Sequence, residues 1–216
     1  MISIMDHFLR FVDKTDAREK LLRLTQFLIV LVLAWWPGSP LLSQLKVQVL
    51  IIRKVLRCFK PLSHGRIALN QITGEHKAAN YGLITLKHIC FMLYLGLDQL
   101  VLLRMLNVIP SNDMTMVLLP KFTNLFWLSA LSVDIRINLG IVQMCDKDPT
   151  RKEQKAQITA RYRTRRRAIR KIIWDVLDSY VVSTYLHYAT VYGSIVGLCG
   201  ITTSVMAMQD LWGGCE

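Results

Sequence analysis

The side chains that could perform covalent chemistry or bind a metal are scattered along this sequence. The five histidines are isolated from one another and from the five cysteines. No Cys-x-x-Cys pair occurs, so neither a zinc site nor a secreted disulfide framework is indicated. The Walker loop, Gly-x-Gly-x-x-Gly, Gly-x-Ser-x-Gly and His-Glu-x-x-His motifs are also missing. We therefore expect no enzyme activity, no catalytic residue, no metal and no cofactor.

The chemistry that the sequence does favour is binding to a surface that is both apolar and anionic. Lys and Arg number 27 against 15 Asp and Glu, which gives a net charge of +12, yet 52% of the residues are hydrophobic. An anionic phospholipid membrane has both properties, whereas nucleic acid is only anionic. We therefore expect a phospholipid membrane as partner and no nucleic acid.

The elements that position these charges are expected to be helices. Proline and glycine clusters divide the chain into segments, and no segment shows the alternation of a β-strand. The fold class that we predict is all-α: an integral membrane helical protein with amphipathic helices and one or two transmembrane helices. The first amphipathic helix is expected to begin at Asp16, with Glu19 completing a capping box.

The second predicted helix combines an apolar stripe with cations. Ser39 is its expected cap, Pro40 lies in its first turn and Pro61 is its expected end. Such a helix can lie in the headgroup layer of a membrane, and the competing interpretation is a helix that packs on its neighbours with its charges in water. The residues that we expect to bind the membrane are Leu45, Lys46, Val49, Ile52, Arg53, Lys54, Leu56, Arg57, Phe59 and Lys60.

A third helical region, roughly 78–106, is apolar except for one narrow polar stripe. At helical spacing this stripe contains Asn80, Lys87, Tyr94 and Asp98. It could face a partner helix, a polar lumen or the headgroups, and an internal contact between helices is the favoured interpretation.

Residues 122–144 resemble a membrane span except for two charges. Eleven Leu, Ile, Val and Phe side chains contribute about −3 to −7 kcal/mol to insertion, and Asp134 and Arg136 cost about +2.5 to +3.5 kcal/mol each. The balance is near zero, so insertion requires these charges to be paired, shielded by another helix or close to an interface.

The final apolar stretch is the best predicted membrane span. Residues 179–209 contain no Asp, Glu, Lys or Arg, and we place the span near 188–209. Small residues recur within it at helical spacing, which favours close packing of helices and self-association. The residues predicted for this packing are Gly193, Gly197, Gly200 and Ser204.

A basic run precedes that span. Ten Lys or Arg and one acidic residue occur between Arg151 and Lys171, and we expect a basic loop over 147–171. Arginines with an interleaved tyrosine can bind RNA, but beside a span they more often meet anionic lipid. A third expected role is that of a docking signal for a chaperone that recognises a basic patch together with an apolar helix. The basic cluster consists of Arg161, Arg163, Arg165, Arg166, Arg167, Arg170 and Lys171.

Several segments, in order, resemble the peroxin-eleven family of peroxisome-proliferation membrane proteins. The resemblance lies in residues 16–28, in the basic segment 53–62, in Tyr94 and Asp98, and in 196–204 followed by 209–212. It implies a location in the peroxisomal membrane, or in a specialised peroxisome such as a glycosome. It also implies that the protein shapes and elongates that membrane, promotes peroxisome division and self-associates as a homo-oligomer.

The resemblance also suggests how the chain is organised. We predict an N-terminal membrane-remodelling region over 1–121 and a C-terminal membrane-anchoring region over 122–216. The family implies that the helix with Arg53, Lys54, Arg57 and Lys60 remodels the membrane and that Arg161–Lys171 contributes to targeting. A peroxisomal membrane-protein import receptor and the fission machinery are the implied partners. The alternative function is a pore-forming channel for small metabolites, lined by the polar stripe with Asp134 and Arg136.

Overall fold

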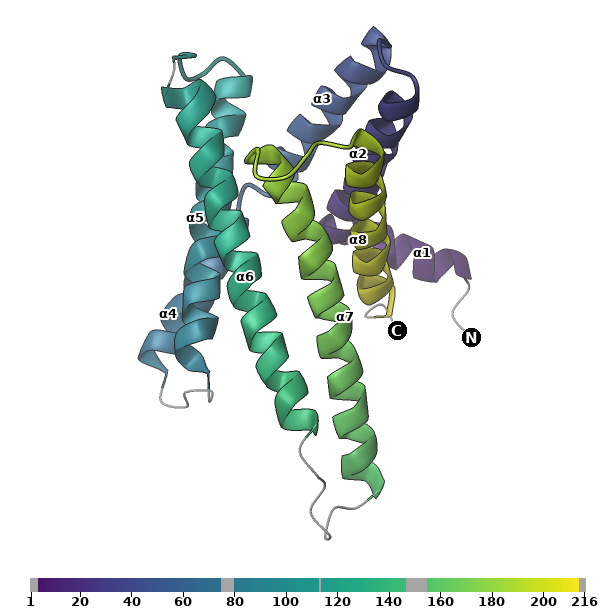
Figure 1. Ribbon diagram of the computed structural model, residues 1–216, viewed down its shortest axis with the longest axis vertical. Helices are drawn as coiled ribbons and strands as arrows, with labels where there is room; N and C mark the ends of the chain where they lie inside the picture. The colour runs from purple at the N-terminus through teal and green to yellow at the C-terminus, as the bar shows by residue number, and fades with distance from the viewer. Residues whose placement is uncertain (1–3, 75–79, 113, 147–154, 214–216) are drawn as a thin grey trace.

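The computed structural model describes residues 4–74, 80–112, 114–146 and 155–213, and every regular element in these ranges is a helix, as predicted (Figure 1). In chain order the elements are α1 (Ile4–Asp13), α2 (Thr15–Trp35), α3 (Pro40–Leu56), α4 (Lys60–Thr73), α5 (Tyr81–Met105), the π-helical turn η1 (Met114–Leu118), α6 (Leu119–Asp146), α7 (Lys155–Tyr185) and α8 (Gly193–Gly213).

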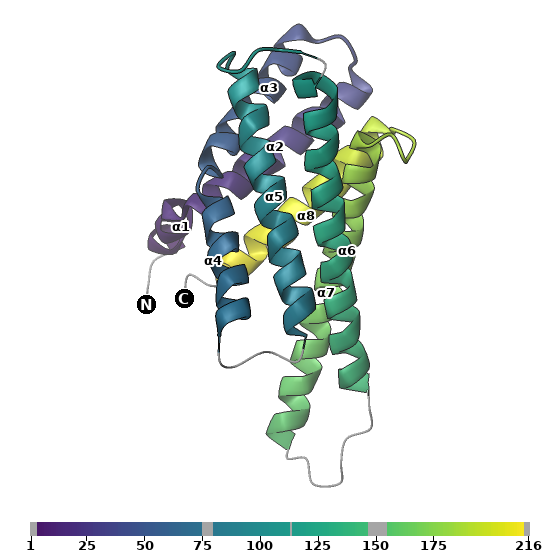
Figure 2. The ribbon, with the colours of Figure 1, turned by 90° about the vertical axis from the view of Figure 1, so that its left-hand side faces the viewer.

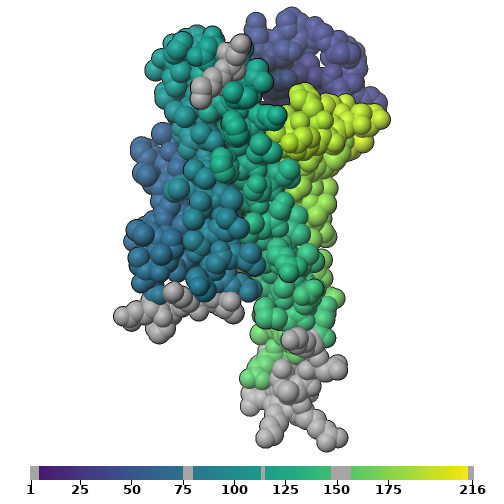
Figure 3. Space-filling view, turned by 60° about the vertical axis from the view of Figure 1, so that its left-hand side comes forward, coloured from purple at the N-terminus to yellow at the C-terminus, as the bar shows by residue number. Residues whose placement is uncertain are grey.

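The helices form two packed groups that α3 and α7 connect. Helices α4, α5 and α6 pack side by side, and α2 packs along α8 (Figures 1 and 2). Helix α3 contacts both α2 and α5, while α7 contacts both α6 and α8. The ends of α6 and α7 that flank the α6–α7 connection extend beyond the rest of the bundle (Figure 3).

The boundary expected near residue 121 does not separate two domains in the structure. It falls in the first turn of α6, and helices from the two sides of it pack on each other, α2 on α8 and α5 on α6. The division of roles between 1–121 and 122–216 therefore stays a prediction, and the structure joins both regions in one bundle.

The first two amphipathic helices begin and end differently from the prediction. Helix α2 begins at Thr15 after Lys14, so the capping box expected from Asp16 and Glu19 is wrong. Ser39 does cap α3, since its Oγ accepts from the Leu42 amide at 3.4 Å. However, α3 ends at Leu56, and Pro61 lies in the first turn of α4. Proline is tolerated there because the first turn needs no N–H partner.

The uncharged stretch 179–209 does not form one span. Helix α7 continues to Tyr185, and α8 begins only at Gly193. Residues 188–192 of the expected span therefore lie in the connection. The prediction of a basic loop over 147–171 is also wrong for the residues that the structure describes, because residues 155–171 form the first turns of α7. Residues 147–154 lie outside the described part.

Among the described residues, three helical stretches are long and apolar enough to cross a membrane: Tyr81–Met105, Thr115–Asp146 and Gly193–Gly213. By length and composition these are three candidate spans, where the sequence predicted one or two transmembrane helices. The burial pattern agrees with a lipid environment. Asp98, Asp134, Asp175 and Asp178 are buried, whereas large apolar side chains such as Leu198 are exposed. Charged groups turned inward are typical of membrane bundles.

The small residues of α8 allow α2 to approach closely. A Cβ at Gly193 would lie 3.1 Å from the Ala34 Cβ, and one at Gly197 would lie 2.9 Å from the Leu31 Cβ. At Gly200 the Phe27 ring fills the space, because a Cβ would fall 2.1 Å from its Cγ. The predicted packing face of α8 is therefore occupied by α2 of the same chain.

Replacing Gly200 with alanine should destabilise the protein by about 1–3 kcal/mol, because the Phe27 ring must leave its place in the core. The matched control is Gly96→Ala in α5, where a Cβ meets nothing within 4 Å; it should gain up to about 1 kcal/mol from the better helix propensity of alanine. Thermal unfolding of the purified protein in detergent measures both. Equal melting temperatures for the two variants would contradict the close contact between α2 and α8.

Candidate functional site

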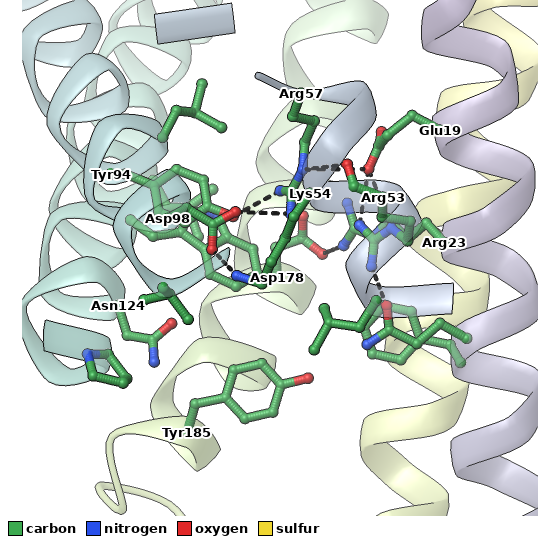
Figure 4. A pocket seen from close by; sticks show the side chains of 18 of the residues that line it. Glu19, Arg23, Arg53, Lys54, Arg57, Tyr94, Asp98, Asn124, Asp178 and Tyr185 are labelled. Atoms are coloured by element: carbon green, nitrogen blue, oxygen red, sulfur yellow. Dashed lines mark hydrogen bonds and ion pairs between the residues drawn. The ribbon is translucent and has the colours of Figure 1, made fainter. Parts of the chain in front are cut away.

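A cluster of charged side chains lies in the centre of the bundle, where α2, α3, α5 and α7 meet (Figure 4). We name it the central ion cluster, and it contains five cations and three carboxylates. Its members are Glu19, Lys20, Arg23, Arg53, Lys54, Arg57, Asp98 and Asp178.

Glu19 is the carboxylate on which α2 and α3 converge. Its Oε1 lies 2.9 Å from Arg53 Nη2, and its Oε2 lies 2.9 Å from Lys20 Nζ. Arg53 Nη1 also donates to the Gln26 amide oxygen. Burial raises the pKa of the Glu19 carboxyl, but Lys20, Arg53 and Arg57 outweigh it and hold the pKa well below its ordinary value. Glu19 therefore remains ionised near neutral pH, and its pair with Arg53 holds α3 on α2.

Asp98 holds α3 on α5 in the same way. Lys54 Nζ is paired with its Oδ1, and Arg57 Nη2 donates to its Oδ2 at 3.0 Å. Arg57 also donates to the Tyr94 hydroxyl at 3.0 Å, and the Tyr94 ring stacks on Trp127 of α6 with ring centroids 5.3 Å apart. The polar stripe predicted on α5 thus makes internal contacts between helices.

A third pair ties α2 to α7 and α8. Arg23 Nη2 lies 2.5 Å from Asp178 Oδ1 and donates to the Thr203 hydroxyl at 3.0 Å. The indole Nε1 of Trp174 donates to Asp178 Oδ2 at 3.1 Å. Arg23 and Asp178 are both buried, so each provides the charge that the other requires.

A second group of charged side chains joins α5, α6 and α7. Asp134 lies 3.2 Å from Lys87 Nζ and 3.4 Å from Lys171 Nζ, and Lys171 Nζ lies 2.7 Å from Asp175. Burial raises the pKa of Asp175 to about 6, although Lys171 opposes the shift. The charge of Asp134 that weighed against insertion is therefore paired, whereas Arg136 is exposed.

The central ion cluster lines a cavity of about 840 Å³. Its walls come from α2, α3, the start of α4, α5, α6, α7 and the start of α8, and the apolar part of the lining includes Phe27, Leu95, Val101, Leu131 and Val196. Figure 4 shows the labelled cations and carboxylates directed toward one another, with Tyr185 and Asn124 at the side of the cavity. No group of three or more potential metal ligands was found among the described residues. The arrangement can bind an anion or hold the helices together.

The structure divides the predicted membrane-binding set between the outside and the inside of the bundle. Leu45, Ile52 and Phe59 are exposed, and Val49 is buried. Arg53 and Lys54 are buried and ion-paired where the prediction placed them among headgroups. The remaining four, Lys46, Leu56, Arg57 and Lys60, are partly buried, and Lys60 pairs with Asp16 at 2.7 Å.

The other two predicted sets are also placed by the structure. The packing residues Gly193, Gly197, Gly200 and Ser204 face α2 or lie buried beside it, so self-association through them stays a prediction. Within the basic cluster, Arg163, Arg166 and Arg167 are exposed. The other members make contacts: Arg161 to carbonyls at the end of α6, Arg165 to Asp146, Arg170 to Asp210 and Lys171 to Asp134 and Asp175.

The sequence reasoning missed two of the three carboxylates of the central ion cluster as ion-pair partners, Glu19 and Asp178. Glu19, Arg23 and Gln26 recur at spacings of four and three on α2, which places them on one face of that helix. On α7, Lys171, Asp175 and Asp178 recur in the same way. These two polar stripes were the available signal, and only their pairing with α3 and α6 depends on the tertiary structure.

Changing Asp178 to asparagine should destabilise the protein by about 3–5 kcal/mol, because it leaves the Arg23 guanidinium buried without a counter-charge. The matched control is Asp210→Asn, since Asp210 is 58% exposed and its pair with Arg170 spans 3.1 Å; its loss should be under about 1 kcal/mol. Thermal unfolding in detergent compares the two. The double change Arg23→Met with Asp178→Leu should recover most of the loss, and a similar deficit for all three variants would refute the role of this pair.

Comparison with known proteins identifies the family of the chain. The family model for peroxisomal biogenesis factor 11 (PEX11) matches residues 5–212. The peroxisomal membrane protein PMP27 of Saccharomyces cerevisiae is 34% identical over 220 residues, which covers 95% of this chain and 93% of the yeast protein. No solved structure matches. The chain therefore belongs to the PEX11 family, and it is a peroxisomal membrane protein involved in peroxisome proliferation.

Proposed function

We propose that this protein shapes and elongates the peroxisomal membrane, and so promotes peroxisome division, by inserting the outer face of α3 into one leaflet and by self-association. The role is mechanical and not enzymatic. The single observation that carries the proposal is the two-sided character of α3. Its cations Arg53 and Lys54 are buried in ion pairs, while Leu41, Leu45 and Ile52 are exposed on the outside of the bundle.

This arrangement supports a wedge. Because Arg53 and Lys54 are paired with Glu19 and Asp98 within the bundle, α3 can present apolar side chains to acyl chains without exposing these two charges there. Each apolar side chain that moves from water into lipid contributes up to about 1.5–3 kcal/mol. Side chains that enter one leaflet from the side of a rigid bundle spread that leaflet and favour curvature, and copies of the protein that associate would concentrate the strain.

The electrostatic attraction to anionic lipid then has to come from another part of the chain. Arg163, Arg166 and Arg167 are exposed in the N-terminal half of α7, the helix whose first end extends beyond the bundle (Figure 3). Each cation near an anionic surface contributes about 1 kcal/mol. We propose that this segment binds the membrane surface or a membrane-protein import receptor, and that exposed apolar faces other than the covered face of α8 mediate self-association and contact with the fission machinery.

A channel for small metabolites is the alternative. Its support is that Tyr94 and Asp98 from the predicted stripe lie on the central cavity. Against it, Lys87 and Asp134 pair with each other between α5 and α6. Planar-bilayer recordings of the purified protein distinguish the two functions, because a channel gives a conductance that Asp98→Leu alters.

The double variant Leu45→Glu with Ile52→Glu should abolish tubulation of anionic liposomes by the full-length protein. Two carboxylates on the outer face of α3 oppose its insertion, and because both positions are exposed, 44% and 47%, folding should be retained. Electron microscopy of the liposomes measures the effect. The matched control is Ser63→Glu with Asn70→Glu, which adds the same charge with the same spacing at exposed polar positions on α4. Equal tubulation by the two double variants would eliminate insertion of this face.

The triple change of Arg163, Arg166 and Arg167 to glutamine should weaken binding to anionic vesicles roughly a hundredfold, since three contributions of about 1 kcal/mol are lost. Vesicle co-flotation measures it, and fluorescence microscopy reports whether the protein still reaches peroxisomes. In the control variant, Arg66, Lys121 and Arg136 are changed to glutamine, which removes the same charge from exposed positions elsewhere. If both sets weaken binding equally, the effect follows net charge and not the α7 segment.

A further inference from the structure

The central cavity has a charge that its own residues do not balance. Among the described residues that line it, nine are Lys or Arg and four are carboxylates. Two of these cations have carboxylate partners outside the lining: Lys60 pairs with Asp16, and Lys171 pairs with Asp134 as well as with Asp175. When Lys60, Lys171 and Asp175 are set aside, seven cations face three carboxylates. The excess of cations over carboxylates therefore remains after the residues with ion-pair partners outside the cavity lining are set aside.

The excess is located at the junction of α2 and α3. In the central ion cluster, Glu19 Oε1 lies 2.9 Å from Arg53 and 4.0 Å from Arg57, while its Oε2 lies 2.9 Å from Lys20. One carboxylate thus serves three cations. Asp98 is shared by Lys54 and Arg57, and only the pair of Arg23 with Asp178 is one to one. The five cations therefore exceed the three carboxylates by two charges.

An excess of this kind calls for a counter-anion. Buried cations without a counter-charge are strongly destabilising, and more so in a bundle surrounded by lipid. Arg53 makes one of its contacts to the neutral amide oxygen of Gln26, at a position where a carboxylate of the same shape would have supplied charge. The walls leave about 840 Å³ of space next to these groups, enough for a ligand larger than a simple ion.

We propose that the cavity binds a phosphate monoester, with its phosphate between the cations of α2 and α3. A phosphate monoester carries about −1.5 to −2 charges at pH 7, which matches the excess of the cluster. The guanidinium groups of Arg53 and Arg57 have the planar donor geometry that binds phosphate oxygens in pairs. The apolar lining at Phe27, Leu95 and Val196 suits the hydrocarbon part of a lipid such as phosphatidate better than a soluble ester.

This site is internal and differs from the surfaces that are proposed above to meet the membrane. It does not depend on the insertion of α3, because it requires only the buried cations and the cavity. If α3 did not bend membranes, the site would still bind its anion.

The experiment uses the full-length protein in an uncharged detergent. Native mass spectrometry measures binding of phosphatidate, with glycerol 3-phosphate as the soluble ester and phosphatidylcholine as the lipid without a monoester. Lys20→Gln lowers the excess by one charge and leaves Glu19 paired with Arg53, so folding should be retained. Gln26→Glu supplies an internal carboxylate to Arg53 with the same shape. The matched control is Lys121→Gln, an exposed lysine that does not line the cavity.

We expect one phosphatidate molecule to bind the unsubstituted protein. The affinity should be at least tenfold lower in Lys20→Gln and in Gln26→Glu, and it should be unchanged in Lys121→Gln. Gln26→Glu should also melt at a higher temperature than the original protein when no phosphate ester is present. Binding of glycerol 3-phosphate with equal affinity and the same variant pattern would support the site and identify a soluble ester as its source. Equal binding of phosphatidate by all variants, or no binding of either ester, would overturn the proposal.

Discussion

The structure depends on one requirement: charges inside a bundle that lipid surrounds need counter-charges. Glu19, Asp98 and Asp178 supply three counter-charges to the five cations of α2 and α3 in the central ion cluster, and Asp134 and Asp175 pair with Lys87 of α5 and Lys171 of α7. Each of these carboxylates contacts a cation on a different helix or orients one within its own helix. The ion pairs therefore determine which helices are neighbours, and the apolar side chains left on the outside determine which surface meets lipid.

The same requirement changes how a basic amphipathic helix should be understood in this family member. Cations on such a helix are normally assigned to the headgroup layer, where they attract anionic lipid. In this chain Arg53 and Lys54 of α3 are held inside by Glu19 and Asp98, so α3 is part of the bundle, and it exposes Leu41, Leu45 and Ile52 beside the uncharged Gln44 and Gln48. The positive surface is instead on α7, at Arg163, Arg166 and Arg167. In the function that we propose, membrane insertion and attraction to the lipid surface therefore belong to different helices.

The close contact of α2 with α8 complements the ion pairs. Glycines at 193, 197 and 200 remove the side chains that would separate the two backbones, and the Phe27 ring fills the space at Gly200. This contact brings Arg23 near Thr203 and Asp178, so steric fit and charge pairing reinforce each other. A stripe of small residues that resembles a self-association motif in isolation here packs within one chain.

The sequence by itself determined the helical class, the membrane environment and the family, because apolar length, charge excess and ordered motifs are properties of local segments. It also located Ser39 as a cap and placed Tyr94 and Asp98 on one stripe. Only the tertiary structure decided that Glu19 pairs with Arg53, that α2 covers the glycines of α8, and that the cations of α3 point inward. These features join residues that are far apart in the sequence, 34 positions in the case of Glu19 and Arg53, and no local pattern specifies the partner. Helical periodicity states which residues share a face, but only the packed neighbours determine whether that face meets lipid, water or another helix.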